Sequence, residues 1–308
     1  MTENHNIIPA RHIHEECGVF GIFTPQEADV ASYAYYALYS LQHRGQESAG
    51  IVVNDDGLFR SLRDTGLVSE VFPPEQLKSL GKGTIAVGHV RYGTTGSDNK
   101  RNVQPILVNH FKGRMALAHN GNLTNSRELR QELESRGSIF QTTTDSEVIA
   151  YIIVQERLNR GSIEEAVSAA MDRIEGAYSL VLSSPTKLIA ARDPHGFRPL
   201  CMGHLKDGSV VFASESCALD AIGAEFERDI RPGEIVVVDR SELIADACAY
   251  LSECDVIGFD TETRPSFTKG VMNKVSLLQL SSGERAFLFR LNRIALEKPL
   301  LQLLSSDR

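Results

Sequence analysis

Cys17 is the residue of this sequence whose type and position best suit nucleophilic chemistry. It stands in HIHEECGVFGIF, where sixteen mostly polar residues precede the thiol and an apolar run follows it. If the chain were cut before Cys17, a free α-amino group would lie beside the thiol. Such a group titrates near pH ~8, so it could accept the thiol proton. The alternative is a structural cysteine in a core strand, which position alone favours.

Three further motifs offer the other groups that amide hydrolysis by a thiol requires. In GHVRYGTTG, Arg91 follows a strand-like run, and its guanidinium could bind a carboxylate through two hydrogen bonds. In HNGNLTN, the Asn120 amide and the Gly121 backbone N–H could form an oxyanion hole. Asp145 in TTTDSEVIAY could hold an ammonium group. The ordinary alternatives are a surface arginine, an Asn-Gly turn and a helix cap.

A second set of candidates lies near the C-terminal end of the sequence. Asp260 and Glu262 are two residues apart in VIGFDTETRPSF, so on a strand both would point to one face. Such a pair can hold divalent cations for phosphodiester hydrolysis. Two solvated carboxylates are the alternative, which residue types alone favour.

The elements that must position these residues can be predicted from the apolar pattern. Short apolar runs bounded by Gly, Asp, Asn or Ser predict strands: CGVFGIF, SAGIVV, TIAVGHV, GRMALAHN, YSLVLSS, KLIAARD, SVVFASE and GEIVVVD. Asp56-Gly57 predicts a hairpin turn. Helices are predicted for EADVASYAYYALYSLQ, NSRELRQELESRG with Asn125 as N-cap, DSEVIAYIIVQERL, and SIEEAVSAAMDRI with a Ser162/Glu165 capping box. Runs of strands with paired helices favour an α+β fold.

Composition limits the classes of function. No apolar run approaches the length of a membrane span, and the first sixteen residues lack the apolar core of a secretory signal. Five widely spaced cysteines are typical of reduced thiols, so a cytoplasmic location without a membrane partner is expected. The net charge of −8 argues against nucleic acid as a partner. The first 239 residues carry all of that charge, and the remainder is neutral, with nine basic and nine acidic residues.

Seven motifs together resemble a known family: HEECGVFGI, SLQHRGQESAGI, GHVRYGTTG, HNGNLTN, TDSEVIAY, RDPHGFRPL and FASESCAL. In this order they closely resemble the glutaminase domain of the amidophosphoribosyltransferases of purine synthesis. That domain is a class-II glutamine amidotransferase of the N-terminal nucleophile hydrolase superfamily. The resemblance implies a four-layer αββα sandwich over residues 17–239, with residues 1–16 as a propeptide that is removed.

The resemblance also implies roles for individual residues, with L-glutamine as substrate and no cofactor. These are Cys17 as nucleophile through a thioester, Asn120 and Gly121 as oxyanion hole, Arg91 for the glutamine α-carboxylate with Gly93 and Thr94 nearby, and Asp145 for the α-ammonium group. The presence of a propeptide points to the propeptide-bearing branch of the family. A homo-oligomer is a further expectation.

The resemblance to this family ends near residue 239. In this family, an apolar strand that ends in paired Asp, followed by a Gly-Thr-Thr loop, binds phosphoribosyl pyrophosphate. Residues 240–308 contain no such segment, so we expect no phosphoribosyl transfer from these residues. Residues 240–308 instead resemble the start of a DEDD-type 3′–5′ exonuclease similar to ribonuclease D. This implies a truncated ribonuclease H-like fragment in which Asp260 and Glu262 would hold Mg²⁺ or Mn²⁺. The competing functions are therefore a glutaminase, a metal-dependent exonuclease and a non-catalytic fusion remnant. The acidic charge and the absent further carboxylates favour the glutaminase.

Overall fold

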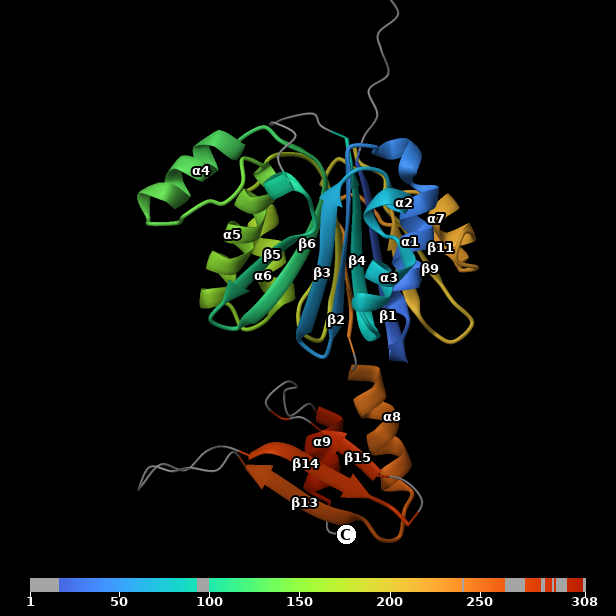
Figure 1. The fold of residues 1–308 in the computed structure, drawn as a ribbon. Helices are drawn as coiled ribbons and strands as arrows, with labels where there is room; N and C mark the ends of the chain where they lie inside the picture. The colour runs from blue at the N-terminus through green and yellow to red at the C-terminus, as the bar shows by residue number, and fades with distance from the viewer. Residues whose placement is uncertain are drawn as a thin grey trace, which may run out of the picture.

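The computed structural model describes residues 17–92, 100–239, 241–263, 275–283, 286–289, 291 and 298–306. Its helices and strands form a larger unit up to Asp239 and a smaller unit after it (Figure 1). The propeptide expected at residues 1–16, and the substrate contacts expected from Gly93 and Thr94, lie outside the described residues.

The larger unit contains two antiparallel sheets. The first has the strand order β11-β9-β10-β1-β4-β2-β3. Its strands are β1 (Gly18–Ala28), β2 (Ser48–Asp55), β3 (Leu58–Thr65), β4 (Gly83–Arg91), β9 (Cys201–His204), β10 (Val210–Ala213) and β11 (Glu225–Asp229). The second has the order β12-β8-β7-β6-β5. It consists of β5 (Ile106–His110), β6 (Gly113–Leu123), β7 (Gly176–Ser183), β8 (Leu188–Arg192) and β12 (Ile235–Val238).

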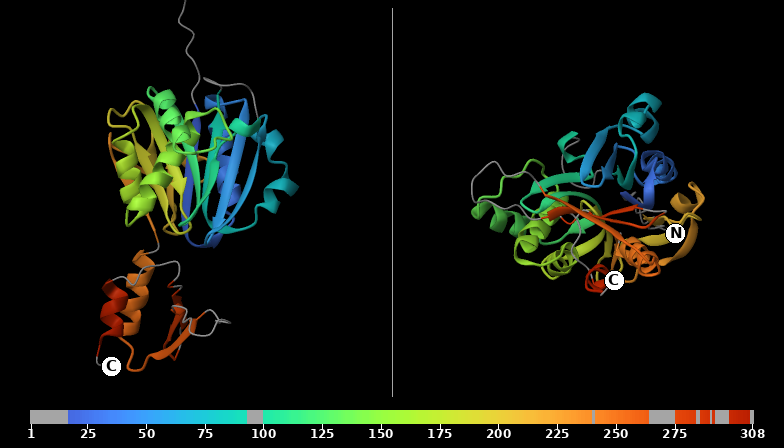
Figure 2. Two further views of the ribbon diagram at one scale, coloured as in Figure 1. Left: turned by 90° about the vertical axis from the view of Figure 1, so that its left-hand side faces the viewer. Right: turned by 90° about the horizontal axis from the view of Figure 1, so that it is seen from below.

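Helices cover the outer face of each sheet, as the two views of Figure 2 show. On the first sheet they are α1 (Val30–Ser40), α2 (Val68–Val71), α3 (Pro74–Ser79) and α7 (Cys217–Asp220). On the second they are α4 (Ser126–Ser135), α5 (Asp145–Asn159) and α6 (Ile163–Met171). Two single turns, η1 (Gln42–Arg44) and η2 (Lys100–Asn102), lie in connections. The layers therefore follow one another as helix, sheet, sheet, helix.

Three large apolar clusters and one small one hold these layers together. Along β1, Phe20 and Ile22 pack against α1, whereas Val19 and Phe23 face the second sheet. The cluster between the sheets also includes Val181 of β7, and a third cluster joins the second sheet to α5 and α6. Because both faces of the central strands are covered, these strands are continuous apolar runs rather than alternating ones. Such runs are the pattern by which the sequence predicted them.

The predicted local signals are largely confirmed, with two corrections. Asp56 and Gly57 have φ values of +48° and +89°, as the hairpin turn between β2 and β3 requires. Ser162 accepts a hydrogen bond from the Glu165 N–H in the predicted capping box. Asn125 precedes α4 as predicted, but its side chain makes no cap; it bonds instead to the backbone of residues 173 and 175. The helix predicted from residue 27 begins at Val30, because β1 continues to residue 28.

The smaller unit contains a three-stranded antiparallel sheet in the order β13-β14-β15. Its elements are α8 (Ser241–Ser252), β13 (Gly258–Thr263), β14 (Val275–Ser281), β15 (Ala286–Phe289) and α9 (Lys298–Leu304). Its apolar cluster is drawn from α8, the sheet and α9, with Leu251, Leu278 and Leu300 among its buried members.

Candidate active site

A cavity of about 320 Å³ brings most of the predicted site residues together. Cys17, Arg91, Gly121 and Asp145 all line it. Antiparallel pairing explains this: Gly18 at the start of β1 pairs with Val90 near the end of β4, so Cys17 and Arg91 lie at the same end of the first sheet. The second sheet contributes Gly121 from β6, and Asp145 is the first residue of α5.

Cys17 is held by its backbone while its side chain reaches the cavity. The thiol donates to the Tyr92 carbonyl oxygen, with Sγ and oxygen 3.6 Å apart. Arg44 Nε donates to the Cys17 carbonyl oxygen at 3.0 Å, and the Arg44 guanidinium is paired with Glu215. Burial alone would raise the pKa of the Glu215 carboxyl, but Arg44 and His43 lower it on balance. Arg44 of the RGQ motif and Glu215 of the SES motif therefore hold the backbone of Cys17 in place.

Arg91 ends β4 with only 6% of its surface exposed. It pairs with Ser48 of β2, and its carbonyl oxygen accepts from the Glu47 N–H at 3.1 Å. The backbone of Gly45 passes so close that an added Cβ would lie 2.6 Å from the Arg91 carbonyl carbon. Gly45 therefore cannot be replaced without moving the strand end that presents the guanidinium.

The predicted oxyanion-hole residues lie on β6, opposite β7. Asn120 pairs with Ser179 and Gly121 with Tyr178. Gly121 has a φ of +141°, and a Cβ there would lie 1.9 Å from the Ala177 carbonyl oxygen, so only glycine fits. Asn120 is fully buried beside the cavity, and neither polar atom of its side chain has a hydrogen-bond partner among the described residues. A buried amide without a partner is costly, which is typical of a group reserved for a ligand.

The Asp145 carboxylate lies at the cavity wall with its orientation fixed. Oδ2 accepts from the Leu123 N–H at 2.9 Å, and Oδ1 lies 3.6 Å from His119 Nδ1. Burial alone would raise the pKa of Asp145, but His119 and the backbone donors of Leu123 and Ser146 lower it on balance. Its charge therefore persists in a largely buried position, as binding of a cation requires.

Three residues that the sequence analysis did not single out complete the site. His119 and Gln104 line the cavity, and His89 lies behind them. His119 Nδ1 is 3.0 Å from Ser146 Oγ, and its Nε2 has no hydrogen-bond partner among the described residues. Burial lowers the pKa of His89 to about 3, so this imidazole is neutral. His89 belongs to the GHVRY motif and His119 to the HNG motif, but neither motif indicates that the two residues lie next to each other in the fold.

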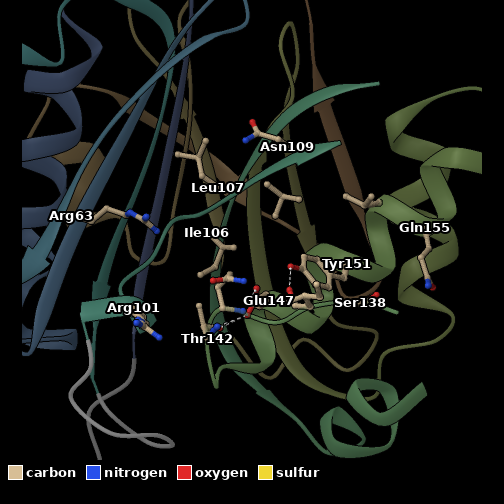
Figure 3. Close-up of a pocket in the computed structure, with 14 residues that line it drawn as sticks. Arg63, Arg101, Ile106, Leu107, Asn109, Ser138, Thr142, Glu147, Tyr151 and Gln155 are labelled. Carbon is tan, nitrogen blue, oxygen red and sulfur yellow. Dashed lines mark hydrogen bonds between the residues drawn. The ribbon is translucent and has the colours of Figure 1, made fainter. Parts of the chain in front are cut away.

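A larger cavity of about 720 Å³ lies between β5 and α5 and does not include Cys17 among its lining residues. Figure 3 shows Arg63 and Arg101 on one side and Tyr151 and Gln155 on the other. The Glu147 carboxylate in its wall accepts hydrogen bonds from the backbone of residues 141 and 142 and from the Thr142 hydroxyl. Glu147 is thus satisfied within the fold. The smaller cavity, which holds the thiol, remains the candidate active site.

The predicted metal pair lies on an exposed strand of the smaller unit. Asp260 and Glu262 are both on β13 and exposed to solvent. Asp260 Oδ1 accepts from the Thr261 N–H at 2.8 Å. Across the part of the chain that the structure describes, no third His, Cys, Asp or Glu joins these two in a group suited to a metal ion. In the same residues, His43, Glu215 and Cys217 do form such a group, but Arg44 already neutralises that carboxylate.

Comparison with known proteins agrees with this geometry. A family described as "Glutamine amidotransferase domain" matches residues 89–221. Amidophosphoribosyltransferase 2, chloroplastic, of Arabidopsis thaliana is 49% identical over 227 residues, which cover 73% of this chain and 40% of that protein. The amidophosphoribosyltransferase of Methanocaldococcus jannaschii is 45% identical over 245 residues, which cover 79% of this chain and 52% of that protein. The chain thus spans about half the length of the curated relatives it matches.

A solved structure matches over the same region. Glutamine phosphoribosylpyrophosphate amidotransferase from B. subtilis, complexed with ADP and GMP, superposes with a TM-score of 0.67 at 43% identity, covering 73% of this chain and 48% of that one. No helix in the described residues is long and apolar enough to cross a membrane. The fold matches that of this solved amidophosphoribosyltransferase, and the chain carries a glutamine amidotransferase domain similar to those of the amidophosphoribosyltransferases.

Proposed function

We propose that residues 17–239 hydrolyse L-glutamine to glutamate and ammonia through a thioester on Cys17. The observation that carries this proposal is the joint lining of one cavity by a thiol, the Arg91 guanidinium, the Asp145 carboxylate and Gly121. A cation and an anion on one cavity complement the two charged ends of an amino acid. The thiol then meets the side-chain amide of the substrate.

The reaction follows from these positions. Arg91 binds the α-carboxylate and Asp145 the α-ammonium group of glutamine. The α-amino group of Cys17, freed by removal of residues 1–16, takes the thiol proton. The thiolate attacks the amide carbon, and the Gly121 N–H with the Asn120 amide stabilises the oxyanion. Protonation of the leaving nitrogen releases ammonia, and water then hydrolyses the thioester to glutamate.

We infer further that this reaction is the ammonia-producing half of amidophosphoribosyl transfer in purine biosynthesis. Support comes from relatives of that name, which are 45–50% identical to this chain over the matched residues. The ammonia-accepting half of those relatives' activity is not part of the proposal for residues 17–239.

Substitution of the thiol tests the proposal. Cys17→Ala should reduce glutamine hydrolysis by at least about 1,000-fold, because no other group can form the thioester. It should also retain residues 1–16, since removal is expected to use the same side chain. Glutamate release and intact mass would be measured. Cys254→Ala, which also removes a half-buried thiol, is the control and should keep both activity and processing. Full activity of Cys17→Ala would refute the proposal, and normal removal of residues 1–16 would refute the self-cleavage.

For residues 240–308 we infer a fragment related to ribonuclease H-like exonucleases that has no nuclease activity of its own. The three-stranded sheet and the placement of Asp260 and Glu262 on β13 support the relationship. A two-metal site needs more than two carboxylates to hold both ions. Single-stranded DNA and RNA would be incubated with the purified chain and Mg²⁺ or Mn²⁺. We expect no shortening; 3′ shortening that disappears in Asp260→Ala would contradict this.

A further inference from the structure

The Gln104 side chain extends the β5–β6 pairing by one step beyond the end of β5. The register runs from His110↔Gly113 to Ile106↔Leu117, which places Gln104 opposite His119. Gln104 Oε1 accepts from the His119 N–H at 2.7 Å, and Gln104 Nε2 donates to the His119 carbonyl oxygen at 3.2 Å. One side-chain amide therefore makes the two bonds that a neighbouring backbone makes in a hydrogen-bonded pair.

The first sheet adds a third bond to the same place. His89 Nε2 lies 3.0 Å from the His119 carbonyl oxygen, and because a carbonyl only accepts, Nε2 must carry the proton. The His119 carbonyl and the Asn120 N–H belong to one peptide plane. Gln104 and His89 thus fix the orientation of the peptide that leads directly into Asn120 and Gly121.

Gln104 is itself held firmly from the opposite side. Arg63 Nη1 donates to the carbonyl oxygens of Val103 at 3.0 Å and Pro105 at 2.8 Å, the two neighbours of Gln104 in the chain. In Figure 3 the Arg63 side chain reaches from β3 toward the segment that leads into Ile106. An added Cβ on Gly50 would lie 2.0 Å from the Gln104 carbonyl oxygen, so the backbones are in close contact. The Gln104 amide is thereby a fixed support and not a surface side chain.

We propose that Gln104 is a positioning residue for the oxyanion hole. An oxyanion hole stabilises the transition state only if its donors are aimed beforehand. The Gln104 amide orients the oxyanion-hole donors because its two hydrogen bonds fix the His119–Asn120 peptide. The charged ends of the substrate are bound elsewhere, by Arg91 and Asp145. This inference rests on the proposed glutamine hydrolysis. The competing role is direct contact between Gln104 and glutamine, since Gln104 also lines the cavity.

Two variants separate these roles. Gln104→Leu removes both bonds to His119, whereas Gln104→Glu keeps the acceptor but sets a carboxylate oxygen against the His119 carbonyl. For both we expect kcat for glutamine hydrolysis to fall about 10- to 100-fold, below the effect of losing an oxyanion donor outright. KM should stay within about 3-fold of wild type, because the contacts to the α-groups are kept. Gln131→Leu, on the exposed side of α4, is the control and should match wild type.

A double-mutant cycle with Asn120→Ala gives a readout that a merely structural role would not produce. If Gln104 acts through the oxyanion hole, substituting Gln104 in the Asn120→Ala background should lower kcat by less than about 2-fold. If Gln104→Leu does not fold, the cycle is made with Gln104→Glu. Additive losses, a raised KM at constant kcat, or wild-type kinetics in both variants would overturn the inference alone. A wild-type chain that does not release glutamate would overturn the proposed function and this inference together.

Discussion

At the scale of single residues, burial separates Cys17 from the core cysteine Cys201. Burial raises the pKa of the Cys201 thiol to about 12, so that residue stays protonated at any physiological pH. Cys17 is only half-buried and opens onto the cavity. The sequence identified Cys17 from its position before an apolar strand and from its resemblance to a family, and the structure supplies the physical contrast with Cys201.

The polar support of the site was not predictable from residue types. His89, Gln104 and His119 are common residues in ordinary contexts, and their function depends on which atoms face each other across two sheets. Gln104 bonds to His119 only because of the β5–β6 register, and β5 itself was not among the predicted strands. Arg91, Gly121 and Asp145, by contrast, stand in motifs whose chemistry can be read locally.

His89 should make stability depend on pH in a defined window. Its ordinary pKa is 6.5 and its pKa in the fold is about 3. Below pH 6.5 the unfolded chain takes up a proton at this site and the folded chain does not, so the free energy of unfolding decreases as pH falls. The slope is ~1.4 kcal/mol per pH unit until the folded pKa is reached. Between pH 7 and pH 5 this amounts to about 2 kcal/mol.

His89→Gln provides the test, because it keeps a donor for the His119 carbonyl but does not titrate. Urea unfolding of both proteins would be measured at pH 7 and pH 5. The loss of stability on acidification should be about 2 kcal/mol smaller for the variant. His110 titrates in both proteins and cancels in the comparison. An equal loss in the two would show that His89 is protonated in the folded chain.

At the scale of elements, the central strands that the sequence predicted have both faces covered. β1, β2 and β4 lie between a helix layer and the second sheet, so they read as unbroken apolar runs. β5 and β11 are end strands of their sheets, and β11 is mostly exposed, with the polar sequence EFERD. β5 has a run of only three apolar residues and β11 a single one, Phe226, so neither was predicted as a strand.

Helix ends show the same dependence on tertiary context. The capping box of α6 is made by residues three apart and was predicted correctly. Asn125 has the right residue type for a cap, but both polar atoms of its side chain are hydrogen-bonded to the backbone of residues 173 and 175 instead. Local propensity therefore predicts a cap only where no distant backbone group needs the same side chain.

At the scale of the whole molecule, the antiparallel order of the first sheet is what assembles the site. Cys17 and Arg91 are 74 positions apart in the sequence, yet the pairing of β1 with β4 sets them at one end. The second sheet then brings Gly121 and, through α5, Asp145. Apolar patterns predict that strands exist but not which strands are neighbours, so this convergence followed only from the family resemblance.

The separation of the apolar clusters leads to a prediction about the two units. The apolar clusters of the larger unit are drawn from residues between Val19 and Val238, and the cluster of the smaller unit from residues between Ile244 and Leu303. A chain ending at Asp239 keeps the Lys187–Asp239 ion pair and every lining residue of the active-site cavity. We therefore expect such a chain to retain kcat/KM for glutamine within about 2-fold of the full chain, since no group that binds substrate or acts on it is removed.

Glutamate release by both chains would be compared at equal concentration, with Cys17→Ala in each background to subtract any uncatalysed release. A large loss of activity in a truncated chain whose thermal unfolding is unchanged would show that residues after Asp239 act on the site.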